Sequence, residues 1–348
     1  MKTRLLGKTP EELKQIAQAL GLPAFAGKQI AQWLYQKRVK SIDQMTNLSK
    51  QGREVLAQQY EVGMIEPIDV QVSKDGTKKY LFPVSCTVGA GQEESCVEAV
   101  MIPDEDRKTL CVSSQAGCKM GCKFCMTGRQ GFHGNLDAAD ILSQFFAVEE
   151  AGELTNTVFM GMGEPLDNWD NVKRVIEVLT ADWGLAWSPK RVTLSTIGVL
   201  PRLKDFLDQS KCHVAVSLHN PFPEERAQMM PVQKAWSETE VIRLLKQYDF
   251  SGQRRVSFEY TVFHGWNDTP RHADELVKIL KHLECRVNLI RFHRIPDFPY
   301  GPAEREQMEA FRDRLVAGGL TATIRASRGE DIFAACGLLA GKHNTSQS

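Results

Sequence analysis

The sequence predicts an α/β protein built around a mostly parallel sheet that curls into a full or partial barrel. Seven short apolar runs follow one another from residue 108 onward, and amphipathic segments lie between most of them. Strands that alternate with helices in this way are typical of parallel sheets. Polar residues come at the ends of the runs, and the carboxyl ends of barrel strands are where functional groups gather. A flat doubly wound sheet is the alternative.

The apolar runs are the length of strands, and the segments between them have the length and periodicity of helices. The predicted strands are 109–114, 156–161, 191–196, 213–219, 255–263, 286–292 and 321–327. The clearest predicted helices between them are 137–152, 171–181, 238–248 and 271–283.

A small helical module is predicted to precede the sheet. Thr9, Pro10 and Glu12 form a helix start, with Thr as N-cap, Pro in the first turn and Glu reaching back. Further helices are expected from about Gly27 and over 49–59. Short alternating runs between residues 69 and 100, separated by Gly-containing turns, indicate strands. We therefore predict a helical domain at 1–62, a β extension at 63–103, the barrel at 104–341 and a tail at 342–348.

The distribution of charge favours an anionic partner for the helical module. The whole chain of 348 residues is neutral, with 43 basic and 43 acidic side chains, but residues 1–60 hold ten Lys and Arg against four Asp and Glu. A basic front end on an acidic body is suited to contact a polyanion. A solvated helical face is the alternative interpretation.

The sequence has no features of a membrane or exported protein. The first residues contain no apolar signal-peptide region, and no uncharged stretch reaches the roughly 18 residues of a membrane helix. We expect a cytoplasmic protein without a membrane partner. Nine cysteines are present, three of them within eight residues, and in a cytosolic chain such a cluster indicates metal or redox chemistry.

The clustered cysteines are Cys118, Cys122 and Cys125, just after the first barrel strand. Thiolates at this spacing can surround one soft metal centre. An iron–sulfur cluster held by three thiolates leaves its fourth iron open for a substrate. A structural zinc site would be one ligand short, unless His133 completes it, and unligated core cysteines are a third possibility.

A second motif, GMGEP, contains Gly163 and Glu164 and follows the second strand. It fails as a dinucleotide-binding fingerprint because Leu166 occupies the position of the third glycine. An ordinary turn is the alternative interpretation, which the neighbouring cysteine triplet makes less attractive.

Together these motifs resemble the radical S-adenosylmethionine (SAM) superfamily, in which Cx3Cx2C ends the first strand and a GGEP-type motif ends the second. Four further segments closely resemble the RlmN/Cfr family of radical-SAM RNA methyltransferases. They are LPAFAGKQIAQWLY in the helical module, CVEAVMIP with Glu98, CVSSQAGC with Cys111, and RASRGEDIFAACG with Cys336. The match runs from about residue 8 to residue 341.

The resemblance implies a partial (β/α)6 radical-SAM barrel with an N-terminal helical accessory domain and a short β extension. It also implies a 4Fe-4S cluster on the cysteine triplet, with the open iron chelating the amino and carboxylate groups of SAM. The positions that match the family's SAM contacts are Gly163, Glu164, Ser195, Ser217, Leu218, His219 and Asn288.

The resemblance further implies a cysteine-based mechanism that consumes two SAM molecules. Cys336 would take a methyl from the first SAM, and a 5′-deoxyadenosyl radical from the second would abstract hydrogen from it. The methylene radical would add to carbon 2 of an adenosine, and Cys111 would release the product through a transient disulfide. Glu98 matches the family's proton acceptor, with Cys111 as the alternative base and an exposed strand carboxylate as the plain interpretation of Glu98.

The implied partners are RNA and an electron donor such as flavodoxin or ferredoxin. The protein itself is expected to be a monomer. The implied targets are an adenosine of 23S rRNA and the adenosine 3′ of the anticodon in some tRNAs. Methylation at carbon 8, as in the Cfr branch, and a non-catalytic zinc-binding RNA module are the alternatives. The cations expected to contact phosphates are Lys28, Lys37, Arg38 and Lys40.

Overall fold

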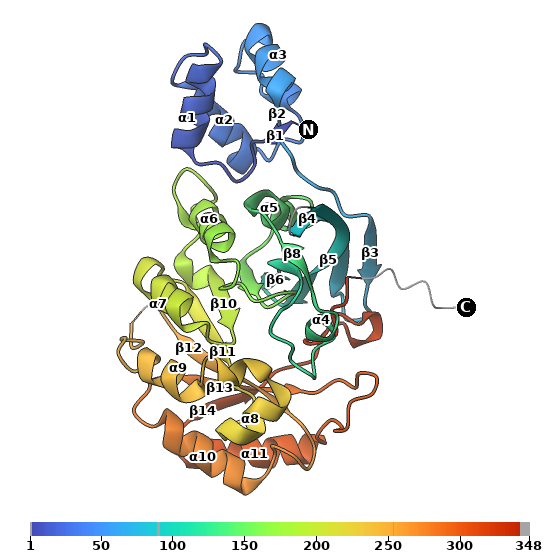
Figure 1. Cartoon of the computed structure of the whole chain (residues 1–348), viewed down its shortest axis with the longest axis vertical. Helices are drawn as coiled ribbons and strands as arrows, with labels where there is room; N and C mark the ends of the chain where they lie inside the picture. The colour runs from blue at the N-terminus through green and yellow to red at the C-terminus, as the bar shows by residue number, and fades with distance from the viewer. Residues whose placement is uncertain (1, 89–90, 253, 342–348) are drawn as a thin grey trace, which may run out of the picture.

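A computed structural model describes residues 2–88, 91–252 and 254–341 of the chain. Its centre is one ten-stranded sheet with the order β14-β13-β12-β11-β10-β9-β6-β5-β4-β3 (Figure 1). The predicted tail at 342–348 lies outside the described residues. No helix among the described residues has both the length and the apolar character of a membrane span.

Seven strands of this sheet are parallel, and each coincides with one of the seven predicted runs. They are β6 (Arg107–Cys111), β9 (Asn156–Phe159), β10 (Val192–Thr196), β11 (His213–Ser217), β12 (Val256–Val262), β13 (Arg286–Arg291) and β14 (Thr321–Ile324). Parallel strands are covered on both faces and need apolar side chains. Leu110, Leu194 and Phe258 are accordingly inaccessible to solvent.

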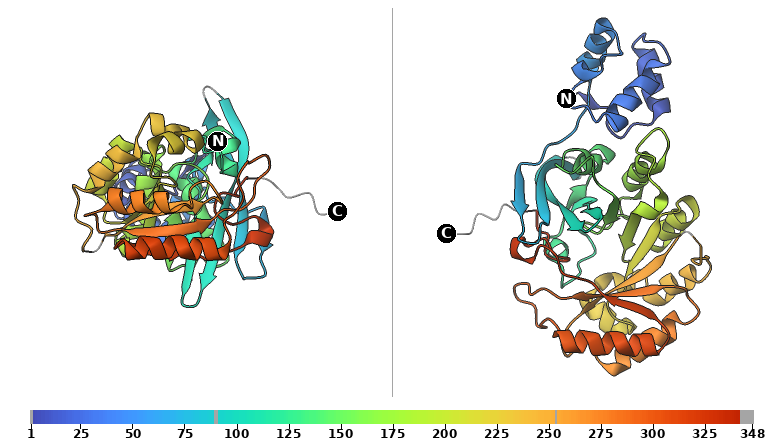
Figure 2. Two further views of the ribbon diagram at one scale, coloured as in Figure 1. Left: turned by 90° about the horizontal axis from the view of Figure 1, so that it is seen from below. Right: turned by 180° about the vertical axis from the view of Figure 1, so that it is seen from behind.

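The helices that connect these strands lie on the outer side of the curved sheet (Figure 2). They are α5 (Ala138–Phe146), α6 (Trp169–Thr180), α7 (Leu200–Gln209), α8 (Pro223–Met229), α9 (Glu238–Leu245), α10 (Pro270–Leu280) and α11 (Arg305–Ala317). All four helices named from the sequence are present, although α5 ends several residues before the predicted end. The linear strand order leaves the described sheet open, which confirms a partial barrel rather than a closed one.

An antiparallel extension continues the sheet beyond β6. It consists of β5 (Gly91–Asp104), β4 (Lys78–Val88) and β3 (Asp69–Val72), paired in that order. A separate small hairpin of β7 (Gln115–Gly117) and β8 (Phe132–Asn135) flanks the short helix α4 (Met126–Arg129). This hairpin encloses the loop that carries the clustered cysteines.

The N-terminal helices form the narrow end of the molecule (Figure 1). They are α1 (Pro10–Ala19), α2 (Ala26–Ala31) with a π-helical continuation (Gln32–Gln36), and α3 (Lys50–Gln59), and β1 (Thr3–Arg4) pairs with β2 (Tyr60–Glu61) beneath them. The start of α1 is a capping box, because Thr9 Oγ1 accepts from Glu12 N at 3.2 Å and Glu12 Oε2 accepts from Thr9 N at 2.6 Å. The domain boundaries stay predictions.

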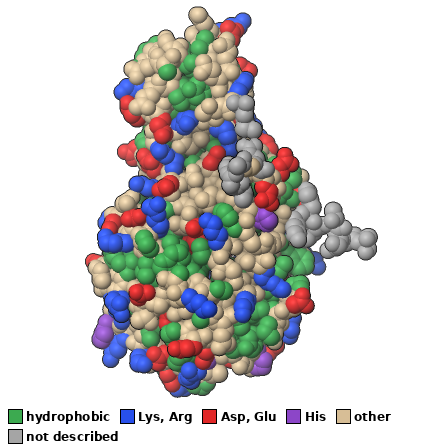
Figure 3. All heavy atoms as spheres, viewed as in Figure 1, with side chains coloured by type: hydrophobic (Ala, Val, Ile, Leu, Met, Phe, Trp, Pro, Cys, Tyr) green, Lys and Arg blue, Asp and Glu red, His purple; other side chains and the backbone are tan. Residues whose placement is uncertain are grey.

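Ion pairs join the N-terminal part to the barrel. Arg4 contacts Asp140 of α5 at 2.6 Å, and Arg174 of α6 contacts Glu12 at 3.2 Å. On the face seen in Figure 3, Lys and Arg side chains lie among Asp and Glu side chains over both parts. This face therefore carries mixed charge rather than a field of one sign.

Candidate active site

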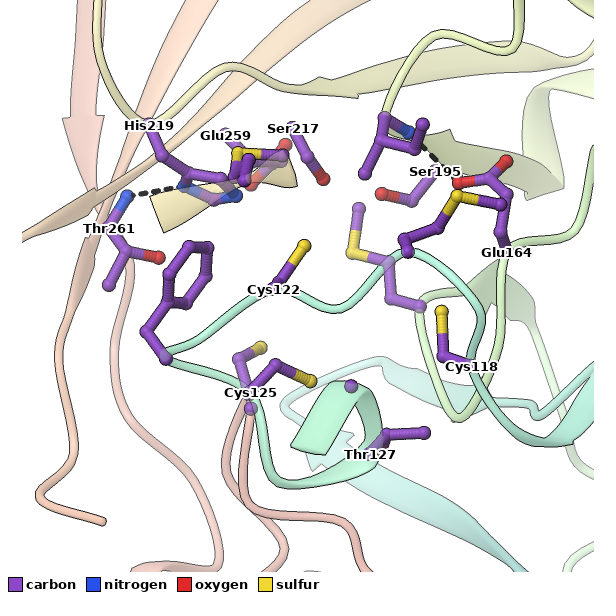
Figure 4. Close-up of a pocket in the computed structure, with 18 of the residues that line it drawn as sticks. Cys118, Cys122, Cys125, Thr127, Glu164, Ser195, Ser217, His219, Glu259 and Thr261 are labelled. Carbon is purple, nitrogen blue, oxygen red and sulfur yellow. Dashed lines mark hydrogen bonds between the residues drawn. The ribbon is translucent and has the colours of Figure 1, made fainter. Parts of the chain in front are cut away.

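A cavity opens at the carboxyl ends of the parallel strands, where the sequence places its polar motifs. The cysteine loop forms one side of it, and the ends of β9 to β13 form the other (Figure 4). The expected site residues that line it are Cys118, Cys122, Cys125, Gly163, Glu164, Ser195, Ser217, His219 and Cys336.

Local backbone geometry presents the cysteine loop to this cavity. Gly117 has a left-handed φ of 71°, and a Cβ there would come within 2.0 Å of the Gly131 carbonyl oxygen. Only glycine fits such a close approach. The next residue, Cys118, donates its backbone N–H to the same carbonyl at 2.7 Å, and Cys125 N donates to Cys122 O at 3.2 Å. These contacts fold the loop so that the three thiols point into the cavity (Figure 4).

The electrostatics of the three thiols fit a multinuclear cation. Burial raises the pKa of Cys118 to about 12 and the pKa of Cys122 well above its usual range, and the neighbouring thiols of the triplet raise both pKa values further. A strong positive centre is therefore needed to hold Cys118 and Cys122 as thiolates. Among the described residues, no three His, Cys, Asp or Glu side chains converge on the position of a single ion. An iron–sulfur cluster binds several thiolates through separate irons, so the donor set suits a cluster.

His133 does not join the cysteines as the zinc interpretation requires. Its Nδ1 lies 2.8 Å from Glu93 Oε1, and it is absent from the residues that line the cavity. The arrangement of the described donors therefore does not favour a structural zinc site.

The GMGEP turn places a buried carboxylate opposite the cysteines. Gly163 has a φ of 95°, and a Cβ there would lie 2.5 Å from Gln115 Cβ. Glu164 accepts hydrogen bonds from Leu166 N and Ile197 N, both at 3.0 Å. Burial raises the pKa of Glu164 to about 7, and these hydrogen bonds only partly oppose the effect. Two backbone N–H groups thus fix the position of the Glu164 carboxylate, which has no cationic partner among the described side chains.

The ends of β10 and β11 complete the wall opposite the cysteines with Ser195, Ser217 and His219. His219 adopts a left-handed φ of 57°, and its Nδ1 accepts from Thr261 N at 2.9 Å. Burial lowers the pKa of His219 to about 3, so the ring is neutral. The Phe124 ring packs edge-on against the His219 ring, with the two ring centroids 4.9 Å apart.

The C-terminal segment brings Cys336 to the cysteine loop. The backbone N–H of Met126 donates to Gly337 O and Thr127 Oγ1 donates to Leu339 O, both at 2.8 Å. These bonds dock the segment on α4, directly after the loop. Burial raises the pKa of the Cys336 thiol, and the charges of Glu259 and Cys125 add to the effect.

Cys111, the last residue of β6, is close enough to Cys336 for their charges to interact. Burial raises the pKa of Cys111 to about 12, and the charge of Cys336 is the next largest cause. Both cysteines are free thiols. The charge of Cys336 therefore acts on Cys111, and the charge of Cys125 of the loop acts on Cys336.

Four predicted site residues lie outside the cavity lining: Glu98, Cys111, Leu218 and Asn288. Glu98 is 2% exposed and pairs with Lys79 Nζ at 3.0 Å, while its Oε2 accepts from Ala340 N at 2.6 Å and Gly341 N at 2.9 Å. Asn288 lines a neighbouring groove instead. Leu218 is buried in the hydrophobic core, and its backbone N–H donates to Glu259 O at 3.0 Å.

Sequence reasoning missed two buried charged residues at this site. Glu259 of β12 lines the cavity, and its Oε2 has no hydrogen-bond partner although Arg325 Nε lies 3.5 Å away. Arg226 of α8 is 1% exposed and donates to the carbonyls of Leu218 and Ser217 at 3.0 Å. A glutamate inside an otherwise apolar strand was the available signal for Glu259. Nothing in the helical pattern of α8 distinguishes Arg226.

Comparison with known proteins agrees with this geometry. Residues 112–281 match the Radical SAM superfamily, and residues 3–62 match the ribosomal RNA large subunit methyltransferase N-terminal domain. A probable dual-specificity RNA methyltransferase RlmN of Porphyromonas gingivalis is 58% identical, with 96% of each chain covered. The dual-specificity RNA methyltransferase RlmN of Syntrophus aciditrophicus is 40% identical over 95% of this chain and 94% of its own.

The fold also matches a solved structure. The crystal structure of a radical SAM methyltransferase from Sphaerobacter thermophilus superposes with a TM-score of 0.90 and 36% identity, covering 98% of this chain and 100% of that one.

Proposed function

The chain belongs to the RlmN family of radical-SAM RNA methyltransferases, and from this premise we propose that it methylates carbon 2 of adenosine through an S-methylcysteine at Cys336. The proposed targets are one adenosine of 23S rRNA and the adenosine 3′ of the anticodon in some tRNAs. The cofactors of the superfamily are a 4Fe-4S cluster and SAM, and the three thiols of the loop would hold the cluster.

One observation supports the proposal: Cys336 lines the same cavity as the cysteine loop, and its charge also acts on a second free thiol, Cys111. A methyl carrier must reach both SAM and the base, and a resolving thiol must reach the carrier. An ordinary structural cysteine needs neither neighbour.

Carbon 2 of adenine is electrophilic and carries no acidic proton, so a nucleophilic methyl transfer to it would fail. A thiolate is a good nucleophile, and Cys336 would attack the methyl group of one SAM and expel S-adenosylhomocysteine. When the loop holds the cluster, the cluster and a second SAM would together supply a 5′-deoxyadenosyl radical. The Cys336 methyl group would lose one hydrogen atom to that radical, and its carbon would then bond to carbon 2.

Release of the product would use the second thiol. The radical adduct would have to lose one electron, for which the superfamily's cluster would be the acceptor. The Cys111 thiolate would then attack the Cys336 sulfur and form a disulfide, in the manner of thiol exchange. The bond between the Cys336 sulfur and the transferred carbon would break, and that carbon would take up a proton to become the methyl group of the released RNA. A base must also remove the proton from carbon 2. We assign this role to Glu98 by the family pattern, with Cys111 as the alternative.

The cavity walls have suitable partners for SAM. Glu164 would accept from the SAM amino group, and Ser195, Ser217 and the neutral His219 line the same wall. Gly163 would let the backbone of the turn approach SAM closely. Leu218 and Asn288 complete the set of residues proposed to contact SAM. An electron donor such as flavodoxin or ferredoxin would reduce the cluster. We propose that the protein acts as a monomer in the cytoplasm.

Peptide mass spectrometry of anaerobically purified protein tests the intermediate. We expect one additional methyl on the peptide that carries Cys336, and none in Cys336→Ala. An unmodified Cys336 after cluster reconstitution and SAM addition would overturn the mechanism. Nucleoside analysis of RNA treated with the holoenzyme then distinguishes 2-methyladenosine, which we expect, from 8-methyladenosine, which would indicate Cfr-type chemistry.

A further inference from the structure

A groove lies at the opposite ends of the strands that form the active-site cavity. It is lined by the first residues of several parallel strands, among them Asn156 of β9, His213 of β11 and Arg286 of β13. The cavity, in contrast, is lined by the last residues of these strands. The two hollows therefore open toward opposite ends of the barrel.

The groove is strongly basic. Among its described lining residues, Asp104 is the one carboxylate, against seven Lys and Arg side chains. We call the set the basic groove, and its cations are Arg107, Lys190, Arg191, Arg255, Arg286, Arg325 and Arg328.

Four of these cations are not neutralised by the protein. Lys190, Arg191, Arg255 and Arg286 are exposed and form no ion pair with another described residue. The other three face carboxylates: Arg107 and Arg328 lie 3.0 and 3.6 Å from Asp104, and Arg325 lies 3.5 Å from Glu259. Uncompensated like charges in one groove repel one another and favour a bound polyanion.

The positive charges of the basic groove act on the imidazole of His213. Burial lowers the pKa of His213, and the charges of Arg255, Lys190 and Arg286 lower it further. The positive potential is thus centred where β11, β12 and β13 begin.

The basic groove reaches the proposed methyl carrier. Cys336 and Ile290 line both the groove and the active-site cavity. The Cys336 residue is exposed as a whole, although its thiol is buried enough for burial to raise its pKa. A base that entered along the groove would meet the thiol from the side opposite the cysteine loop.

The helical module offers fewer free cations than the sequence suggests. Arg38 packs over the Phe146 ring at 5.9 Å, and Lys40 pairs with Glu66 at 2.7 Å. Lys28 and Lys37 remain exposed without an ion-pair partner among the described residues.

We propose that RNA binds along the basic groove and that the target adenine, turned out of its loop, reaches Cys336 through this mouth of the barrel. Lys190, Arg191, Arg255 and Arg286 would contact the flanking phosphates. The inference rests on the proposed function, since it assigns the route of that substrate. An unstacked base in a loop is the form of RNA that enzymes of this kind can reach. The route keeps the base and SAM on opposite sides of the thiol that joins them.

A pair of matched variants tests the route. Arg255→Gln/Arg286→Gln removes two charges from the groove, and Arg243→Gln/Lys281→Gln removes two exposed charges elsewhere. Binding of a labelled anticodon stem-loop to each holoenzyme would be followed by anisotropy at several salt concentrations. We expect the groove variant to bind the stem-loop at least tenfold more weakly than the wild type. Its affinity should also depend less steeply on salt, by the amount that about two phosphate contacts contribute. The control should bind like the wild type.

A second measurement needs no variant and is unaffected by misfolding. Bound stem-loop RNA should protect Lys190 of the wild-type holoenzyme from acetylation, as read by peptide mass spectrometry, and should leave Lys281 reactive. Equal binding by the two variants together with an unprotected Lys190 would overturn the route.

The same assays separate this inference from the proposed function. If the wild type forms methyladenosine while the groove proves irrelevant, only the route fails. If the wild type binds RNA in the groove but forms no methyladenosine, the proposed reaction fails and the RNA surface stands.

Discussion

At the scale of single residues, two opposite charges act on the Cys336 thiol. The charge of Arg325 lowers the pKa of Cys336, whereas burial and the charge of Glu259 raise it. Because the thiolate is the nucleophile, the balance between these side chains sets how readily the cysteine accepts a methyl group.

Two neutral substitutions test this balance. Glu259→Gln keeps the shape of the side chain and should lower the pKa of Cys336, while Arg325→Gln should raise it. The pH dependence of Cys336 alkylation by iodoacetamide, followed on its peptide, measures both shifts. Shifts in the same direction in the two variants would contradict the electrostatic account.

The raised pKa of Glu164 predicts a pH-dependent affinity for SAM. Its pKa is about 7, so the carboxyl loses its charge as the pH falls from 8 to 6 and becomes a poorer acceptor for the SAM amino group. The ratio of wild-type to Glu164→Gln affinity should therefore fall about tenfold over this range. Equilibrium dialysis of labelled SAM with the cluster-loaded proteins measures it. A ratio that stays constant would show that Glu164 does not titrate there.

At the scale of elements, the antiparallel extension holds the C-terminal segment that carries Cys336. Glu98 of β5 accepts from two backbone N–H groups at Ala340 and Gly341, and Lys79 of β4 balances its charge. The pair is almost fully buried, so neither charge can be hydrated if the other is removed.

Lys79→Ala should consequently be among the more damaging substitutions outside the cavity. Leaving one member of a buried ion pair without its partner costs about 3–5 kcal/mol. Lys108→Ala, which removes a more exposed pair with Glu153, should cost no more than ~1 kcal/mol. Urea unfolding of the two variants and the wild type compares them. Similar losses in both would mean that the Glu98 contacts do not stabilise the fold.

At the scale of the whole molecule, the seven parallel strands and many residues of the candidate site could be predicted from the sequence, whereas the joining of the antiparallel extension to the same sheet could not. Apolar runs of strand length and spaced cysteines are local signals, and they placed the seven strands and the triplet. Contacts between distant segments leave no such signal. The position of Glu98 under the C-terminal segment, the buried Glu259 and the basic groove all depend on residues that only the folded sheet brings together.

The docking of the C-terminal segment also has a consequence for biosynthesis. Cys111 and the cysteine triplet leave the ribosome long before Cys336, which follows the last strand, β14. A nascent or prematurely terminated chain lacks the segment that carries Cys336. In the proposed mechanism, methyl transfer therefore waits until this segment has been synthesised.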